Sequence, residues 1–166
     1  MTTFTKEITI ETSKTKVWAI LSDLGGVYKF HPGVVHSYYS TDSKNGVGAA
    51  RICELAPMGK IEETAVDWVE GEQYTLKLDP LEKAPPLKDA KGIVKLTEVS
   101  PNQTKVTVDL SYGVKLGIIG KMLNSLVLKD QLNKGIEGLL KGLKVYAEQG
   151  KEIKNNKELY KILSAA

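Results

Sequence analysis

The segment GVGAARICELAPMGKIEETAVDWVE, residues 46–70, decides the fold. Its two halves, Ala49–Leu55 and Ile61–Val69, alternate polar and apolar residues. A period of two is typical of half-buried β-strands. Pro57, Met58 and Gly59 lie between the halves and are suited to a turn. The segment therefore predicts two antiparallel strands joined by a short turn.

The same alternation continues on both sides of this hairpin. It predicts five further strands, over Thr3–Thr12, Val34–Ser40, Gln73–Leu78, Gly92–Val99 and Lys105–Tyr112. Because turn residues separate the strands, we expect a seven-stranded antiparallel meander. The alternation is interrupted over Asp79–Lys91 by three prolines, which cannot occupy interior strand positions, so a long loop is expected there.

Two short helical segments are predicted after the first strand. Ser13 is a candidate N-cap, and Val17, Leu21 and Leu24 recur with the spacing of one helix face. Two glycines, at positions 25 and 26, end this helix. The short apolar link Val27–Gly33 predicts one more helical turn.

The strongest helical segment is Leu116–Gln149, but its apolar stripe does not run straight. The apolar face of its first half is rotated by roughly 100° from that of its second half. We therefore expect a kink, bulge or short break between Leu126 and Asp130, which would let both halves face the sheet.

Gly135, Gly138 and Gly142 lie on one flank of the second half of this helix. Each glycine costs up to about 1 kcal/mol in helix propensity relative to alanine. The favoured interpretation is that they let the helix approach a strand closely, and the alternative is that they leave room for a ligand.

Length and composition predict one α+β domain over residues 1–149, with residues 150–166 as a helical extension. The chain has 166 residues, 42% hydrophobic and 26% charged, which is typical of a globular protein. It contains no apolar run of the length of a signal peptide or a membrane span, so we expect a cytoplasmic protein without stable membrane insertion. We expect a monomer or weak homodimer.

Charge and composition also exclude several classes of partner. The net charge of +3 is small and the lysines are dispersed, which argues against nucleic acid. Cys53 is the only cysteine and the two histidines lack a paired spacing, so we predict neither a disulfide nor a metal site. No nucleotide-binding glycine loop is present, and no cofactor is predicted.

Four short segments carry a family resemblance. They are Val17-Trp18 before Leu21–Leu24, Phe30–Val34, Gly46–Arg51, and Glu62-Glu63 before Asp67-Trp68. In this order, over about residues 3–149, the chain resembles the helix-grip (SRPBCC, START-like) superfamily, which includes START lipid-transfer domains, birch-pollen-type allergens and polyketide cyclases/dehydrases. It is most similar to the polyketide cyclase/dehydrase and lipid-transport family. One departure is Phe30, where relatives often have tryptophan.

The resemblance implies a seven-stranded curved sheet that wraps around the long C-terminal helix, with an internal cavity for a hydrophobic molecule. The first hypothesis is a protein that carries or sequesters a small lipid, polyketide-like or aromatic ligand. The second is a cofactor-independent cyclase or dehydratase acting on a polyketide-like or aromatic substrate. The third is a lipid or quinone carrier that docks on membranes through its lysines and C-terminal tail. Fold likeness alone does not decide between them.

Arg51 is the only arginine in a lysine-rich chain, which indicates a fixed geometric task for its planar guanidinium. An internal partner such as Glu63 is the favoured explanation, and the alternative is an acidic or carbonyl group of the ligand. Alternation does not decide whether Glu62 or Glu63 faces the cavity. His31 and Glu63 are the candidate catalytic residues, as proton carriers.

The remaining candidates are aromatic, thioether and thiol side chains expected to line the pocket. The full set of predicted ligand-binding residues is Tyr28, Phe30, His31, Tyr38, Arg51, Cys53, Met58, Glu63, Tyr74, Tyr112 and Met122. The Ala56–Lys60 turn and the Pro80–Lys88 loop are expected to flank the mouth of the pocket.

Overall fold

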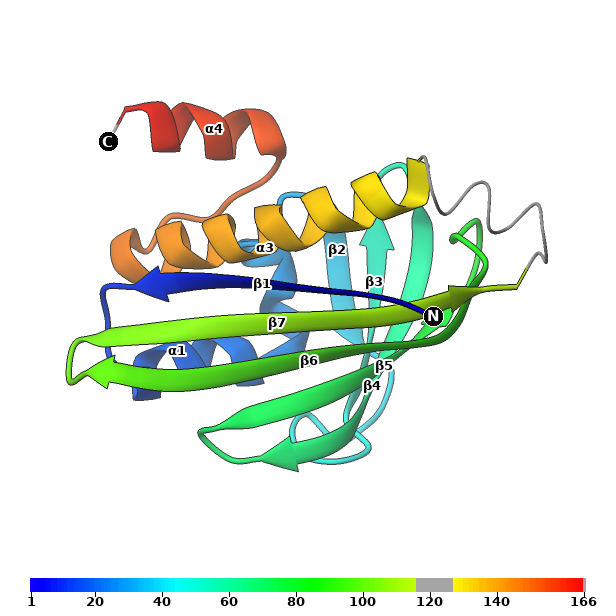
Figure 1. The fold of residues 1–166 in the computed structure, drawn as a ribbon, viewed down its shortest axis with the longest axis horizontal. Helices are drawn as coiled ribbons and strands as arrows, with labels where there is room; N and C mark the ends of the chain where they lie inside the picture. Colours follow the sequence, from blue (N-terminus) through cyan, green and yellow to red (C-terminus); the bar gives the residue numbers. More distant parts are fainter. Residues whose placement is uncertain (116–126, 166) are drawn as a thin grey trace.

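A computed structural model, which describes residues 1–115 and 127–165, contains one curved sheet with a long helix across its inner face (Figure 1). The seven strands are β1 (Thr2–Ile10), β2 (Val34–Tyr39), β3 (Ala50–Leu55), β4 (Gly59–Val69), β5 (Gln73–Pro80), β6 (Leu87–Ser100) and β7 (Gln103–Val114). They are antiparallel in the order β1-β7-β6-β5-β4-β3-β2. The predicted seven-stranded antiparallel sheet is confirmed.

The first strand pairs with the last. The register runs from Thr2 opposite Tyr112 to Ile10 opposite Thr104. This pairing places β1 at one edge of the sheet and leaves β2 at the other. All other neighbours in the sheet are also neighbours in the sequence, as a meander requires.

The predicted long loop over Asp79–Lys91 is wrong at both ends. β5 continues to Pro80, which is its last residue and lies opposite Ile61, so its missing N–H interrupts no interior ladder. β6 already begins at Leu87, which is buried and lies opposite Val114. Only residues 81–86 join the two strands. A register shift between Lys88 and Lys91 interrupts the alternation, which hid this part of β6.

Two short helices follow β1, as predicted, but the first ends at Ser22, and Gly25 and Gly26, which were expected to end it, lie inside the second. Helix α1 (Lys14–Ser22) begins after Ser13, whose side chain accepts a hydrogen bond from the backbone N–H of Lys16. The 3₁₀ helix η1 (Leu24–Lys29) follows directly and packs beside β2. Together they close one end of the space between the sheet and the C-terminal helix (Figure 1).

Both tryptophans hold α1 against the sheet through one carboxylate. The indole N–H of Trp18 on α1 donates to Glu70 Oε1 at 2.7 Å, and that of Trp68 on β4 donates to Glu70 Oε2 at 2.8 Å. The ring of Trp68 stacks on Tyr74 of β5 at a centroid distance of 5.3 Å. These hydrogen bonds lower the pKa of Glu70, first through Trp68 and then through Trp18.

The C-terminal helix α3 (Lys129–Gln149) lies across the inner face of the sheet and ends at Gly150, which has a left-handed conformation with φ 69°. Helix α4 (Asn156–Ser164) packs on the side of α3 that faces away from the sheet (Figure 1). Val145 of α3 and Leu159 of α4 are buried in this contact. No helix within the described part of the chain has the length and apolar character needed to cross a bilayer.

The predicted irregularity before α3 falls partly on described residues. Val127 and Leu128 are π-helical and directly precede the α-helical start at Lys129. The first half of the predicted helix, residues 116–126, lies outside the described residues, as does the angle between the two halves.

Two of the three helix glycines permit a close approach, but not to a strand. A Cβ atom on Gly142 would overlap the carbonyl oxygen of Phe30, and one on Gly138 would lie 2.9 Å from Cγ of Pro32. The helix therefore packs against the link between η1 and β2. The third position, Gly135, would have nothing within 4 Å of an added methyl group, so packing does not require glycine there.

Candidate functional site

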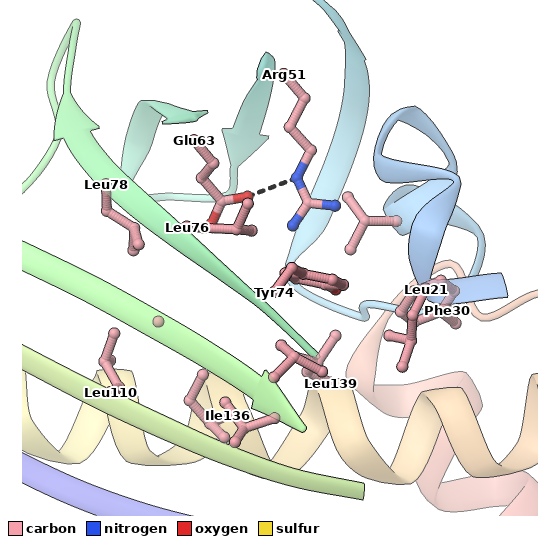
Figure 2. A pocket seen from close by; sticks show the side chains of 14 residues that line it. Leu21, Phe30, Arg51, Glu63, Tyr74, Leu76, Leu78, Leu110, Ile136 and Leu139 are labelled. Carbon is pink, nitrogen blue, oxygen red and sulfur yellow. Dashed lines mark hydrogen bonds and ion pairs between the residues drawn. The ribbon is translucent and has the colours of Figure 1, made fainter. Parts of the chain in front are cut away.

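The described residues enclose a cavity of about 70 Å³ between the sheet and α3 (Figure 2). Its wall is apolar except for one ion pair and one tyrosine hydroxyl. The lining residues are Leu21, Val27, Phe30, Arg51, Glu63, Tyr74, Leu76, Leu78, Gly92, Val94, Val108, Leu110, Ile136 and Leu139. The long C-terminal helix contributes the last two, which face the sheet across the cavity (Figure 2).

Strand alternation and one glycine create this space. Tyr74, Leu76 and Leu78 are successive inward positions of β5. Gly92 is the matching position of β6, opposite Leu76. A Cβ atom there would lie 3.8 Å from a methyl group of Leu78 and 4.0 Å from one of Leu110, which are ordinary contacts. The absent side chain of Gly92 therefore leaves room inside the wall.

The polar part of the wall is the ion pair between Arg51 and Glu63. The two residues face each other across β3 and β4, and Arg51 Nε donates to Glu63 Oε2 at 2.6 Å. The side chains are only 9% and 17% exposed. Arg51 Nη1 also donates to the carbonyl oxygen of Leu24 at 2.7 Å, which ties η1 to the sheet. Glu63, and not its neighbour Glu62, is thus the inward residue.

These hydrogen bonds leave Arg51 Nη2, with its two N–H groups, and Glu63 Oε1 unused. They occupy Nε and Nη1 of Arg51 and Oε2 of Glu63. No described residue forms a hydrogen bond with Arg51 Nη2 or with Glu63 Oε1. Burial acts to lower the pKa of Arg51, but the charge and hydrogen bond of Glu63, together with smaller contributions from Cys53 and Tyr74, raise that pKa overall. The guanidinium therefore stays charged.

Cys53 supports the ion pair without lining the cavity. Its thiol lies 3.4 Å from Glu63 Oε2, to which it donates a hydrogen bond. Burial, and secondarily the Glu63 carboxylate, raises the pKa of the thiol. Cys53 is therefore a neutral thiol at physiological pH and adds one more donor to the atom that Arg51 already contacts.

The candidate proton carrier His31 lies beside the site and does not line the cavity. Its Nδ1 accepts a hydrogen bond of 3.0 Å from the backbone N–H of Gly33, which places the proton of the neutral ring on Nε2. The pKa of His31 is lowered to about 4, chiefly by burial and also by the Arg51 charge, whereas the Glu63 carboxylate opposes the shift. The imidazole is neutral at pH 7.

The other predicted residues are divided between the wall and other places. Phe30 and Tyr74 line the cavity, and burial raises the pKa of the Tyr74 hydroxyl to about 12. Tyr28 and Tyr38 lie on the outer surface, 38% and 39% exposed, with the ring of His36 between them. The sequence predicted both tyrosines in the pocket, but neither lines the cavity.

Two further predicted residues, Met58 and Tyr112, are also absent from the described cavity wall. Met58 lies in the turn between β3 and β4. Tyr112 is fully buried in a neighbouring apolar cluster with Leu87 and Leu128. Met122 lies outside the described residues.

The two segments expected at the mouth are bonded to each other. The backbone N–H of Lys60 donates to the carbonyl oxygen of Glu82 at 2.8 Å, and that of Leu81 donates to the carbonyl oxygen of Lys60 at 2.9 Å. Gly59 has φ 84°, and a Cβ atom there would overlap the backbone of residues 82–84. The β3–β4 turn and the 81–86 loop thus form one unit.

Most of the lining residues were not predicted from the sequence, although signals were present. The inward leucines and valines of β5, β6 and β7 follow the strand alternation. Gly92 interrupts a strand, which is a known sign of space or close approach. Ile136 and Leu139 belong to the apolar stripe of the helix. These residues have the sequence pattern of ordinary core residues, so the pattern alone does not mark them as lining a cavity.

Residues 1–148 match the family described as polyketide cyclase/dehydrase and lipid transport. Among solved structures, the fold is similar to a START superfamily protein from Mycobacterium smegmatis, with 17% identity, a TM-score of 0.72, and coverage of 90% of this chain and 99% of that one. A protein from Thermus thermophilus has 19% identity and a TM-score of 0.72, with 88% and 97% covered.

A third similar structure is the Zhui aromatase/cyclase from Streptomyces sp. R1128. It has 12% identity and a TM-score of 0.67, with 92% of this chain and 99% of that chain covered. No curated protein sequence matches the chain. At these identities the structural likeness concerns the fold, and the predicted helix-grip architecture is confirmed.

Proposed function

The chain belongs to the polyketide cyclase/dehydrase and lipid transport family, and we propose that it binds a compact hydrophobic molecule between the sheet and α3, as a carrier or sequestering protein. The observation that carries this proposal is the apolar cavity, among whose described lining residues there is a single ion pair. Ligand sites in proteins are typically apolar spaces with a few convergent polar groups. Burial of the guest would contribute about 25 cal/mol per Å² of apolar surface.

The size of the cavity restricts the guest. About 70 Å³ is several times the volume that one water molecule needs, about 10–15 Å³, but less than the roughly 150 Å³ of a cavity that admits benzene. A ring-sized molecule thus requires a small outward movement of the wall, such as new rotamers of Leu78, Leu110 or Leu139. A lipid with long acyl chains would require the sheet and α3 to separate. The size therefore favours a compact guest over a membrane lipid or a quinone.

A second candidate function is a cyclase or dehydratase activity on a polyketide-like or aromatic substrate. The observation in its favour is Glu63 Oε1, a carboxylate oxygen without a described hydrogen-bond partner at the wall of an apolar cavity. Glu63 would accept the proton and the adjacent Arg51 would stabilise the resulting charge. His31 has no place in the wall and supports this activity less.

Native mass spectrometry of the purified protein tests the proposed function. We expect a noncovalent adduct of low mass that is released on mild activation. Gly92→Val places a branched side chain into the cavity with only ordinary contacts at its first carbon. This variant should fold, unfold at a higher temperature than the wild type, and lose the adduct.

The matched control is Lys91→Val, which introduces the same side chain at the adjacent exposed position of β6. It should retain the adduct. An adduct that survives Gly92→Val unchanged would place binding elsewhere and refute the proposed site. Release of a chemically altered molecule from the wild type, but not from Glu63→Gln, would favour the enzymatic candidate.

A further inference from the structure

The geometry of the ion pair points to a more specific ligand: we propose that the guest is a neutral molecule with one hydroxyl group, which lies against Arg51 and Glu63. This inference rests on the proposed function and adds the chemical class of the ligand. It differs from the alternative raised by the sequence, in which Arg51 anchors an acidic or carbonyl group.

The charge balance of the wall disfavours an anionic ligand. The Arg51 guanidinium is already neutralised by the Glu63 carboxylate at 2.6 Å. Among the described lining residues, the other titratable group is the hydroxyl of Tyr74, which is uncharged at neutral pH. A ligand carboxylate would therefore lose its hydration, approach Glu63 and find no uncompensated cation. A fatty acid does not fit this wall.

The hydrogen-bonding capacity of the wall favours a hydroxyl group. Glu63 Oε1 acts only as an acceptor of hydrogen bonds, and the two N–H groups of Arg51 Nη2 act only as donors. A hydroxyl group donates and accepts, so a single such group can serve both atoms. A carbonyl oxygen would leave Oε1 without a donor, and an N–H group would leave Nη2 without an acceptor. An unsatisfied buried polar atom carries a large cost, so the hydroxyl is preferred.

The opposite wall requires the rest of the ligand to be apolar. Leu110, Ile136 and Leu139 face the cavity on the side of α3, away from Arg51 and Glu63 (Figure 2). A guest that spans this space has one polar end on the sheet and an apolar body toward the helix. A phenol or a small alicyclic alcohol has this distribution of polarity.

Three probes of one ring and one substituent test this inference: phenol, toluene and benzoate. Their dissociation constants are measured by titration of the ¹⁵N-labelled full-length protein, followed by NMR. We expect phenol to bind at least about tenfold more tightly than toluene, because its hydroxyl group bonds to a charged pair. Benzoate should bind most weakly.

The double variant Arg51→Met with Glu63→Leu removes both charges and keeps similar volumes. Toluene should then bind more tightly than phenol, because the hydroxyl group loses its partners and still loses its hydration. Glu62→Gln, the adjacent carboxylate on the other face of β4, is the matched control and should keep the wild-type order. The comparison of the three probes on the wild type tests the inference independently of how well the double variant folds.

The outcomes separate this inference from the proposed function. If toluene binds the wild type as tightly as phenol and Gly92→Val abolishes both, the cavity binds hydrophobic molecules and the hydroxyl preference is refuted. Tightest binding by benzoate also refutes it. If none of the probes binds and the native mass spectrum shows no adduct, the proposed function itself fails.

Discussion

Gly142 of α3 packs directly against the backbone carbonyl of Phe30, with no room for a β-carbon between them. This contact sets how close the helix lies to the link between η1 and β2. It also sets the position of the Phe30 ring, which is buried and lines the cavity. A backbone contact outside the cavity therefore controls part of the cavity wall.

Gly142→Ala should destabilise the protein by about 1–3 kcal/mol, because the Phe30 carbonyl must move to admit the methyl group. Gly135→Ala, on the same helix, should instead stabilise it by about 0.5–1 kcal/mol, because the added methyl group meets nothing and the helix propensity improves. Urea denaturation followed by circular dichroism measures both. Equal effects of the two substitutions would contradict the packing described for Gly142.

The ion pair predicts strong coupling between its two members. Glu63→Leu alone leaves the Arg51 guanidinium buried without its counter-charge, and Arg51→Met alone leaves the carboxylate; each should cost about 3 kcal/mol or more of unfolding free energy. The double variant should recover most of this loss, because apolar side chains of similar size then fill the space. A double-mutant cycle measures the coupling. Additive losses would show that the pair is not the stabilising unit.

The lowered pKa of His31 predicts that the folded protein loses stability as the pH falls. The pKa is about 4 in the folded protein and near 6.5 in the unfolded chain, so between these values the unfolded chain binds more protons. The contribution of this group is complete above pH 6.5 and is lost as the pH falls toward 4. His31→Asn keeps an acceptor for the Gly33 N–H but does not titrate, so it should weaken this dependence.

Melting temperatures of the wild type and His31→Asn between pH 7.5 and 4 test this prediction. The control is His36→Asn, at an exposed position on β2, which should retain the wild-type profile. Parallel profiles for the wild type and His31→Asn would show that another group carries the acid dependence.

The hydrogen bonds from the two indoles to Glu70 are a second acid-sensitive contact, and tryptophan fluorescence can report on it. Its pKa is lowered by the indole hydrogen bonds from Trp68 and Trp18, so its contribution to stability is present above the unfolded pKa of 4.5 and is lost as the pH falls through the lower folded value. Glu70→Ala removes the shared acceptor of both indoles. The variant should lower the melting temperature and shift tryptophan emission, whereas Glu98→Gln, an exposed carboxylate on β6, should do neither.

Sequence patterns predicted the sheet well because alternation is a direct consequence of strand geometry. They failed where a bulge shifts the register. On β2 the shift between Val34 and His36 turns Tyr38 outward, although unbroken alternation from buried Val34 would turn it inward. On β4 a shift between Ala65 and Asp67 explains why both parities of that strand contain apolar residues.

The candidate site could be predicted only in its polar part. Arg51 was conspicuous as the single arginine, and the pairing of β3 with β4 then places Glu63 opposite it. The apolar wall has no such signature, because a leucine beside a cavity and a leucine in a filled core have the same pattern. The difference arises from the absent side chain at Gly92 and from the separation of β5 and β6 from α3, which are tertiary properties.

The pairing of β1 with β7 has a consequence for synthesis of the chain on the ribosome. Thr2 leaves the exit tunnel before its partner Tyr112, which emerges only after five intervening strands have been made. Until then β1 has no neighbour in the sheet, and its apolar residues Ile8 and Ile10 have no core to enter. Closure of the sheet must therefore come late, and a nascent chain truncated before β7 would expose β1 as an unpaired strand.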